Sequence, residues 1–229
     1  MLAQGKQENM IIAIDGPAGA GKSTIAKLLA ERLEYLYVDT GAMYRAQTLK
    51  VLWLKADFED IPKLVEIAKQ TDIKLKKGED NRTIVLLDGE DVSAAIRKPA
   101  VTNAVFHIAA IAEIRNLMVR FQRDYAQNNS IVMEGRDIGT VVFPYAKKKF
   151  YLDAKVKVRA KRRKLDLEQK GIDLGLDEIV RQIKERDKRD FTRECGPLKQ
   201  AEDAIYIDTS SMNITEVVNC LLSHIKDEE

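Results

Sequence analysis

Residues Gly16–Thr24 read Gly-Pro-Ala-Gly-Ala-Gly-Lys-Ser-Thr, a segment that fits the pattern G-x-x-x-x-G-K-[ST]. The preceding apolar run, Met10–Asp15, is typical of a buried parallel strand. After the glycines, apolar residues recur at the spacing of one helix face, at Ile25, Leu28, Leu29 and Leu33. A strand, a glycine loop and a helix in this order indicate a phosphate-binding loop (P-loop), and a chance glycine turn would not bring both flanking elements with it.

The residue types of this loop suit a triphosphate. Glycines let successive backbone N–H groups turn toward one point, and the helix that follows adds free N–H groups and the positive end of its dipole. Lys22 can reach the β- and γ-phosphates as a mobile charge, and the hydroxyl of Ser23 can ligate Mg²⁺. We therefore expect the triphosphate site to include Gly16, Pro17, Ala18, Gly19, Ala20, Gly21, Lys22, Ser23 and Thr24.

Composition indicates a globular chain with one core. The chain has 229 residues, of which 45% are hydrophobic, enough for a single domain with insertions. The formal net charge is only +2, so overall charge gives no reason to expect nucleic acid or a membrane as partner. The two cysteines lack metal-ligand spacing, Met1–Asn9 is too polar for a secretory signal, and no apolar run could span a bilayer. We expect a soluble cytoplasmic protein.

Four further segments have the pattern of short core strands, namely Tyr35–Asp39, Ser130–Glu134, Lys149–Asp153 and Ala204–Asp208. The predicted helices between and after them are one capped by Thr40, then Ile61–Gln70, Asn103–Ala126, Lys155–Lys170, Leu176–Phe191 and a last helix capped by Asn213. This alternation predicts an α/β fold with a five-stranded parallel sheet and helices on both faces. Ile73–Lys77 and Thr83–Leu87, around a turn-like stretch at Gly78–Asn81, instead predict a small antiparallel insert.

Two predicted helices carry charges where an apolar stripe should continue. The stripe that begins at Leu176 runs into Arg186, Asp190 and Arg193, and the stripe that includes Ile108 runs into Arg115. Buried charges need partners, so Asp190 can pair with Arg186 or Arg193, and the other charges invite an anionic ligand. The alternative is that these helix ends leave the core and their charges are solvated. The basic helix at 155–170 is likewise either a solvated face or a lid over the triphosphate.

Four segments together resemble the bacterial cytidylate kinases, a family of nucleoside monophosphate kinases. They are the P-loop, Asp39–Arg45 (Asp-Thr-Gly-Ala-Met-Tyr-Arg), Glu134–Pro144 (Glu-Gly-Arg-Asp-Ile-Gly-Thr-Val-Val-Phe-Pro) and Arg186–Asp190 (Arg-Asp-Lys-Arg-Asp). The second and third are much more specific than the P-loop, and the resemblance runs from Ile11 to Leu222. It implies one kinase domain over 1–229, with a core at 10–40, 128–155 and 200–229. An acceptor-binding lobe would span about 41–127, with the β-insert at about 72–101, and a helical lid about 156–175.

The resemblance also implies transfer of the γ-phosphoryl group of ATP to CMP or dCMP with Mg²⁺. The acceptor would be bound by Thr40, Tyr44, Arg45, Arg115, Arg136, Asp137, Arg186, Asp190 and Arg193. Arg45, Arg136 and Arg186 would hold its phosphate, Arg115 and Asp137 would read cytosine, and Asp190 and Arg193 would reach the sugar. The catalytic residues would be Lys22, Arg136, Arg186, Arg159 and Arg163, and Arg162 would also contact ATP.

These roles are chemically reasonable. The exocyclic amine of cytosine can donate to a carboxylate such as Asp137, whereas uracil presents a carbonyl at that position. Bidentate arginines suit phosphate oxygens, and the acceptor phosphate is already an oxyanion. No protein nucleophile is needed, so catalysis depends on positioning and charge neutralisation.

Phe106 departs from the family pattern. In the helix that carries Arg115, the family often has a serine near cytosine at this position, so one base contact is lost or replaced by packing. Glu134 ends a core strand beside the P-loop, where its carboxylate could hold Mg²⁺-bound water.

Two other functions are compatible with a P-loop: a kinase for a different small acceptor, or a nucleotide-binding sensor that transfers nothing. The Arg136-Asp137 pair argues against the first, and Lys22, Ser23 and the basic helix argue against the second. No sequence feature indicates an oligomer, so we expect a monomer.

Overall fold

The computed structural model describes residues 9–78, 83–169 and 171–226. The polar segment before residue 9, the predicted turn residues 79–81 and the predicted helix end at residue 170 lie outside this part of the chain. No helix within the described ranges is long and apolar enough to cross a membrane.

The main sheet consists of five parallel strands in the spatial order β2 (Leu36–Asp39), β6 (Ile131–Glu134), β1 (Ile11–Asp15), β7 (Lys148–Asp153) and β8 (Ile205–Asp208). The predicted strands are confirmed, and each ends at the residue that the sequence pattern indicated. The main helices are α1 (Lys22–Leu33), α2 (Thr40–Trp53), α3 (Ile61–Lys69), α4 (Pro99–Ala110), α5 (Ala112–Ala126), α6 (Val156–Glu168), α7 (Leu176–Thr192) and α8 (Ile214–Lys226).

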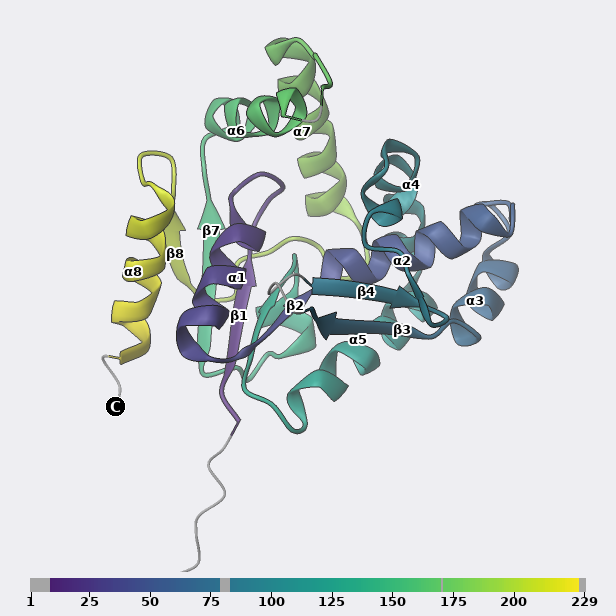
Figure 1. The fold of residues 1–229 in the computed structure, drawn as a ribbon, viewed down its shortest axis with the longest axis horizontal. Helices are drawn as coiled ribbons and strands as arrows, with labels where there is room; N and C mark the ends of the chain where they lie inside the picture. The colour runs from purple at the N-terminus through teal and green to yellow at the C-terminus, as the bar shows by residue number, and fades with distance from the viewer. Residues whose placement is uncertain (1–8, 79–82, 170, 227–229) are drawn as a thin grey trace, which may run out of the picture.

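The strands bury both of their faces because successive side chains point to opposite sides of a sheet. On one side, Ile12, Ile14 and Phe150 belong to the core that α1 and α8 complete. On the other side, Ala13 and Met133 belong to the core that α2 and α5 complete. Figure 1 shows α6 and α7 above the ends toward which the parallel strands run. This is the edge at which open α/β sheets bind ligands.

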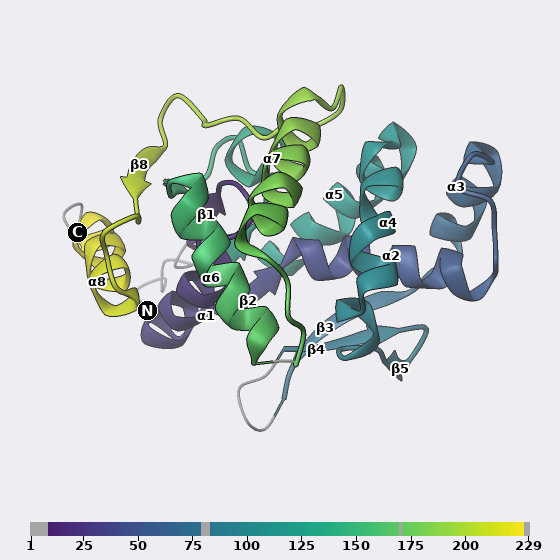
Figure 2. The same ribbon diagram turned by 90° about the horizontal axis from the view of Figure 1, so that it is seen from above.

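A second, antiparallel sheet is formed by β3 (Ile73–Lys77), β4 (Thr83–Leu87) and the short β5 (Glu90–Asp91). The predicted insert is therefore confirmed, with β5 as an additional strand. This sheet lies with α2, α3 and α4 on one flank of the main sheet, as the two views in Figures 1 and 2 show. The chain thus has a sheet-centred core, a flanking lobe and a helical pair above the strand ends.

Two local predictions were wrong. The single helix predicted at 103–126 is two helices, because Ile111 takes an extended backbone conformation (φ −81°, ψ 117°) between α4 and α5. The break leaves the carbonyl of Ala109 available to Arg115, whose Nη1 donates to it at 3.3 Å. The cap of α2 is Asp39 and not Thr40, because the Asp39 carboxylate accepts the Ala42 N–H at 2.8 Å.

Candidate active site

The P-loop joins β1 to α1 in a preformed shape. Gly16 has a positive φ (146°), and a side chain there would collide with the carbonyl of Leu152 on β7, so only glycine fits. Lys22 is buried, and its ammonium donates to the carbonyl of Pro17 at 2.8 Å. Burial, reinforced by the nearby charge of Arg136, lowers the pKa of Lys22 to about 7. The loop therefore holds a desolvated amine, and an anion bound beside Lys22 would raise its pKa and favour the protonated, charged form.

Acidic side chains end β2 and β6 beside this loop. Glu134 is buried, and Tyr37 donates to its Oε1 at 3.1 Å. Burial and the charge of Asp39 raise the pKa of Glu134, whereas Lys22 and the hydroxyl of Ser23 oppose that shift. A hydroxyl and carboxylates are the hard oxygen donors that Mg²⁺ prefers, so Ser23 and Glu134 fit a Mg²⁺–phosphate complex. Within the described ranges, no group of three or more His, Cys, Asp or Glu residues could hold a metal ion.

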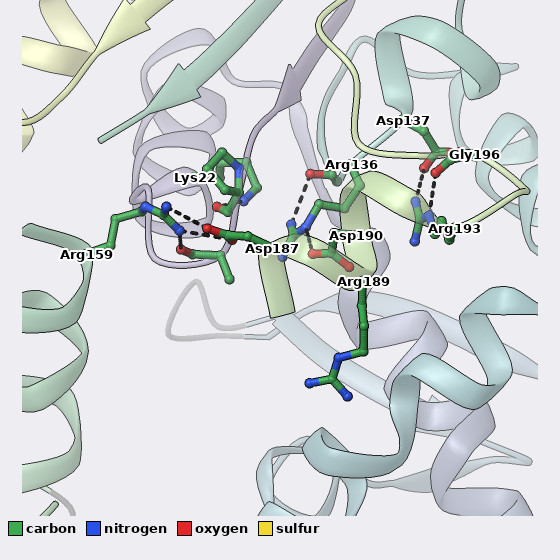
Figure 3. Close-up of polar contacts among 12 residues, drawn as sticks. Lys22, Arg136, Asp137, Arg159, Asp187, Arg189, Asp190, Arg193 and Gly196 are labelled. Atoms are coloured by element: carbon green, nitrogen blue, oxygen red, sulfur yellow. Dashed lines mark hydrogen bonds and ion pairs between the residues drawn. The ribbon is translucent and has the colours of Figure 1, made fainter. Parts of the chain in front are cut away.

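A cluster of charged residues lies next to the P-loop, at the end of β6. We call it the acceptor cluster, and it consists of Arg45, Arg115, Arg136, Asp137, Arg186, Asp190 and Arg193. Its central contact joins Arg136 Nε to Asp190 Oδ2 at 2.8 Å (Figure 3). The charges of Arg186 and Arg193, the two partners that helical spacing suggested, do act on Asp190. Its hydrogen bond is with Arg136 instead, which follows β6 and lies against α7.

Asp137 is the most enclosed carboxylate of the acceptor cluster, with 6% of its surface exposed. It forms an ion pair with Arg115, and its Oδ1 lies 3.5 Å from Arg193 Nη2. Burial raises the pKa of Asp137, whereas the charges of Arg115 and Arg193 oppose the shift. The guanidinium of Arg115 also lies 5.7 Å from the ring centre of Tyr44. A carboxylate, guanidinium groups and an aromatic ring together can recognise a planar polar base.

Gly196, after the end of α7, closes over this pair. Its carbonyl accepts from Arg193 Nε at 2.5 Å, and its φ is +57°. A Cβ at this position would collide with both Arg115 and Asp137. Sequence reasoning missed Gly196, and the only signal was a glycine three residues beyond Arg193.

The arginines of the acceptor cluster that the sequence predicts to bind phosphate are incompletely satisfied. Arg45 Nη2 contacts Asp39 at 3.1 Å, but Arg45 Nε is buried without a hydrogen-bond partner among the described residues. Burial, followed by the charge of Arg136, lowers the pKa of Arg186 to about 10, and Arg45 and Arg163 add to that effect. Cations that destabilise one another in this way favour an anion between them.

The three predicted lid arginines on α6 differ in their surroundings. Arg159 is buried and donates to Ala18 O at 3.0 Å and to Asp187 Oδ2 at 2.7 Å, so it ties α6 and α7 to the P-loop (Figure 3). Arg162 donates to the carbonyl of Thr209 at 2.6 Å. Arg163 is exposed, and its charge acts on Arg186. Asp187, which anchors Arg159, was not among the predicted site residues.

The sequence as a whole matches known proteins over most of its length. A family model described as Cytidylate kinase matches residues 12–227. The chain belongs to the cytidylate kinase family. It is 49% identical over 219 residues to a protein named Cytidylate kinase from Desulforamulus reducens, covering 96% of this chain and 98% of that protein. It is 50% identical over 211 residues to another of that name from Caldicellulosiruptor bescii, covering 92% of this chain and 93% of that protein.

A comparison of structures adds support for the fold alone. A solved protein from Eubacterium ventriosum, described as uncharacterized, covers 96% of this chain with all of its own length, at a TM-score of 0.52 and 16% identity. Family membership and the observed sheet agree with the α/β P-loop kinase fold that the sequence predicted.

Within this cytidylate kinase family, Phe106 is the position that the sequence pattern set apart. The structure places its ring on α4, 39% exposed, against the ring of His107 at 3.9 Å. The guanidinium of Arg189, which extends from α7 (Figure 3), lies 4.6 Å from the centre of the Phe106 ring. The residue thus forms a contact between the flanking lobe and α7.

Proposed function

We propose that this chain transfers the γ-phosphoryl group of ATP to CMP or dCMP, giving ADP and CDP or dCDP. The observation that carries this proposal is the acceptor cluster, in which an enclosed carboxylate and several arginines lie beside a P-loop at one edge of the sheet. The names of the relatives from Desulforamulus reducens and Caldicellulosiruptor bescii support the same acceptor.

On the donor side, we propose that Lys22 leaves the Pro17 carbonyl and binds the β- and γ-phosphates. The remaining P-loop residues Gly16, Pro17, Ala18, Gly19, Ala20, Gly21, Ser23 and Thr24 would wrap the triphosphate with backbone N–H groups. Ser23 and Glu134 are the residues that would hold Mg²⁺, which would neutralise phosphate charge. Arg159 and Arg162 would keep α6 over the nucleotide, and Arg163 would approach the transferring group.

On the acceptor side, Arg45, Arg136 and Arg186 would bind the phosphate of CMP, and Thr40 would also contact the acceptor. Asp137 and Arg115 would read cytosine beside Tyr44, and Asp190 and Arg193 would reach the sugar. An oxygen of the acceptor phosphate attacks the γ-phosphorus, and the bond from that phosphorus to the β–γ bridging oxygen breaks. Because both reactants are anions, the arginines lower the barrier by neutralising charge and fixing the line of attack.

We also propose the predicted division into core, acceptor-binding lobe (about 41–127) and lid (about 156–175), and a cytoplasmic monomer that binds its nucleotides and neither nucleic acid nor a membrane. The nearly balanced charge of the chain and its two free cysteines support this setting. Size-exclusion chromatography with light scattering would test the monomer.

The function is tested by measuring ADP release with ATP and Mg²⁺ against equal concentrations of CMP, dCMP, UMP, AMP and GMP. We expect clear preference for the cytidine nucleotides. Equal rates with all five would contradict the proposed acceptor and favour a kinase of another specificity. Binding of ATP with no release of ADP for any acceptor would favour a nucleotide sensor.

A further inference from the structure

Asp15, the last residue of β1, has no role in the transfer described above, yet both of its carboxylate oxygens are occupied. The side chain is buried, with 4% of its surface exposed. Oδ1 accepts the N–H of Ile138 at 2.8 Å, and Oδ2 accepts the N–H of Gly139 at 2.7 Å. These N–H groups begin η2 (Ile138–Val142), a short π-helical turn that directly follows Arg136 and Asp137.

The loop with Arg136 and Asp137 is thus attached to β1 at both of its ends. Before the two residues, the N–H of Gly135 donates to the carbonyl of Ile14 at 3.0 Å. After them, Asp15 binds the next two N–H groups. The packing is close, since a Cβ on Gly139 would lie 3.4 Å from Asp15 Oδ2 and 3.2 Å from Lys149 Cδ. The strand that leads into the P-loop therefore also fixes the position of the acceptor residues.

We propose that Asp15 is a positioning residue for the acceptor, which holds Arg136 and Asp137 at a fixed distance and orientation relative to the P-loop. It touches neither substrate and acts through η2. The inference rests on the proposed function and adds to it a residue from the donor side that controls acceptor binding. A carboxylate that only stabilised the fold would change both substrate affinities together, or neither.

Charged and titratable groups surround Asp15 from three directions. They are Lys22 on α1, Arg136 and Asp137 after β6, and Lys149 and Tyr151 on β7. Burial raises the pKa of Asp15 to about 6, with Asp137 adding to the shift and the two N–H groups and Lys22 opposing it. As pH falls through this value, one oxygen becomes a hydroxyl and no longer accepts an N–H, so the loop should loosen.

The matched variants are Asp15→Asn, which keeps the size but replaces one acceptor oxygen by a donor, and Asp15→Ala, which removes both acceptors. For Asp15→Asn we expect the KM for CMP to rise about ten- to a hundredfold, because a hydrogen bond to a charged group is lost. The KM for ATP should stay within about twofold, because the loss of a side-chain hydrogen bond acts locally when distant sites are independent. A similar rise for both substrates, or for neither, would overturn the positioning role.

A pH series separates this role from simple structural damage. A phosphate monoester itself titrates near pH 6, so wild type must be compared with Asp15→Asn at each pH. The KM of Asp15→Asn for CMP divided by that of wild type should fall toward one as pH falls below about 6, because the protonated carboxyl of wild type then also lacks one hydrogen-bond acceptor. A ratio that stays constant from pH 5 to 8 would count against the proposal.

Amide hydrogen exchange tests the same contact without nucleotides, and in wild type alone if the variants do not fold. Below pH 6, the protection factors of the Ile138 and Gly139 N–H groups, which correct for the intrinsic effect of pH on exchange, should fall relative to those of the β7 amides. Unchanged protection would overturn the proposal.

If wild type does not phosphorylate CMP, the proposed function fails. If it does, but the variants leave the KM for CMP unaltered, only the role of Asp15 fails.

Discussion

Lys22, on the proposed donor side of the site, donates to a main-chain carbonyl of the P-loop, whereas Arg115, Arg136 and Arg193, on the proposed acceptor side, contact carboxylates. A phosphate on the donor side therefore displaces a neutral group that the fold holds in place. In the acceptor cluster, arginines outnumber carboxylates, so a bound phosphate would supply the negative charge that the network lacks. Removing Lys22 should slow transfer, whereas removing a cation of the acceptor cluster such as Arg136 also leaves a carboxylate without its partner.

The largest effect is expected for Lys22→Met. Loss of a preorganised charge at the transferring phosphate should lower kcat about 10²- to 10³-fold, with CMP binding preserved. Steady-state kinetics and calorimetric CMP titration would measure the two quantities. Lys27→Met, on the same helix but outside the loop, should behave like wild type. If Lys22→Met lowered the affinity for CMP as much as it lowered kcat, the donor and acceptor sides would not be energetically separate.

Arg136→Ala should have the next largest effect, since it removes a proposed phosphate ligand and the ion-pair partner of Asp190. We expect kcat/KM for CMP to fall about a hundredfold or more, the range for truncating one member of a partly buried charge pair. ATP binding, followed by fluorescence titration of a nucleotide analogue, should change little. Arg181→Ala, on the exposed face of α7, is the control. An equal loss of ATP affinity would contradict the assignment of Arg136 to the acceptor.

Gly196→Ala tests the packing over Asp137. The added Cβ must push Arg115 and Asp137 apart, so we expect kcat/KM for CMP to fall about tenfold, as when buried polar partners are separated. Gly171→Ala is a matched control, because Gly171 also has a positive φ (72°) but no atom within 4 Å of its added Cβ. Both variants carry similar backbone strain, so a difference between them isolates the acceptor contact. Equal kinetics in the two variants would show that strain alone matters.

Loss of the contact between Phe106 and Arg189 should have the smallest effect on acceptor binding. Phe106→Leu and Arg189→Gln, alone and combined, form a double-mutant cycle on the KM for CMP. We expect a coupling of about two- to fivefold, the size of a partly exposed cation–π contact. Additive effects would show that Phe106 and Arg189 do not act together on acceptor binding.

The features that followed from the sequence are those that local chemistry determines. The P-loop pattern and the strand ends depend on neighbouring residues, and each strand ends at its predicted residue. The break at Ile111 was not visible, because the apolar spacing continues through it. Helical spacing also suggested nearby partners for Asp190, whereas its hydrogen-bond partner Arg136 comes from the loop after β6.

The unpredicted site residues all depend on contacts between distant parts of the chain. Asp15 binds N–H groups more than a hundred residues away, and Asp187 anchors Arg159 from a different helix. Gly196 is needed only because Arg115 and Asp137 meet beneath it. Sequence patterns report which face of an element is apolar, but they do not report which elements meet at a site.

The most direct single measurement is the ratio of kcat/KM for CMP to that for UMP, in wild type and in Asp137→Asn. We expect wild type to favour CMP by about tenfold or more, because a carboxylate accepts from the cytosine amine and repels the uracil carbonyl. The ratio should fall toward one in Asp137→Asn, whose amide can face either base. Equal use of CMP and UMP by wild type, or an undiminished ratio in the variant, would contradict the reading of the base by Asp137.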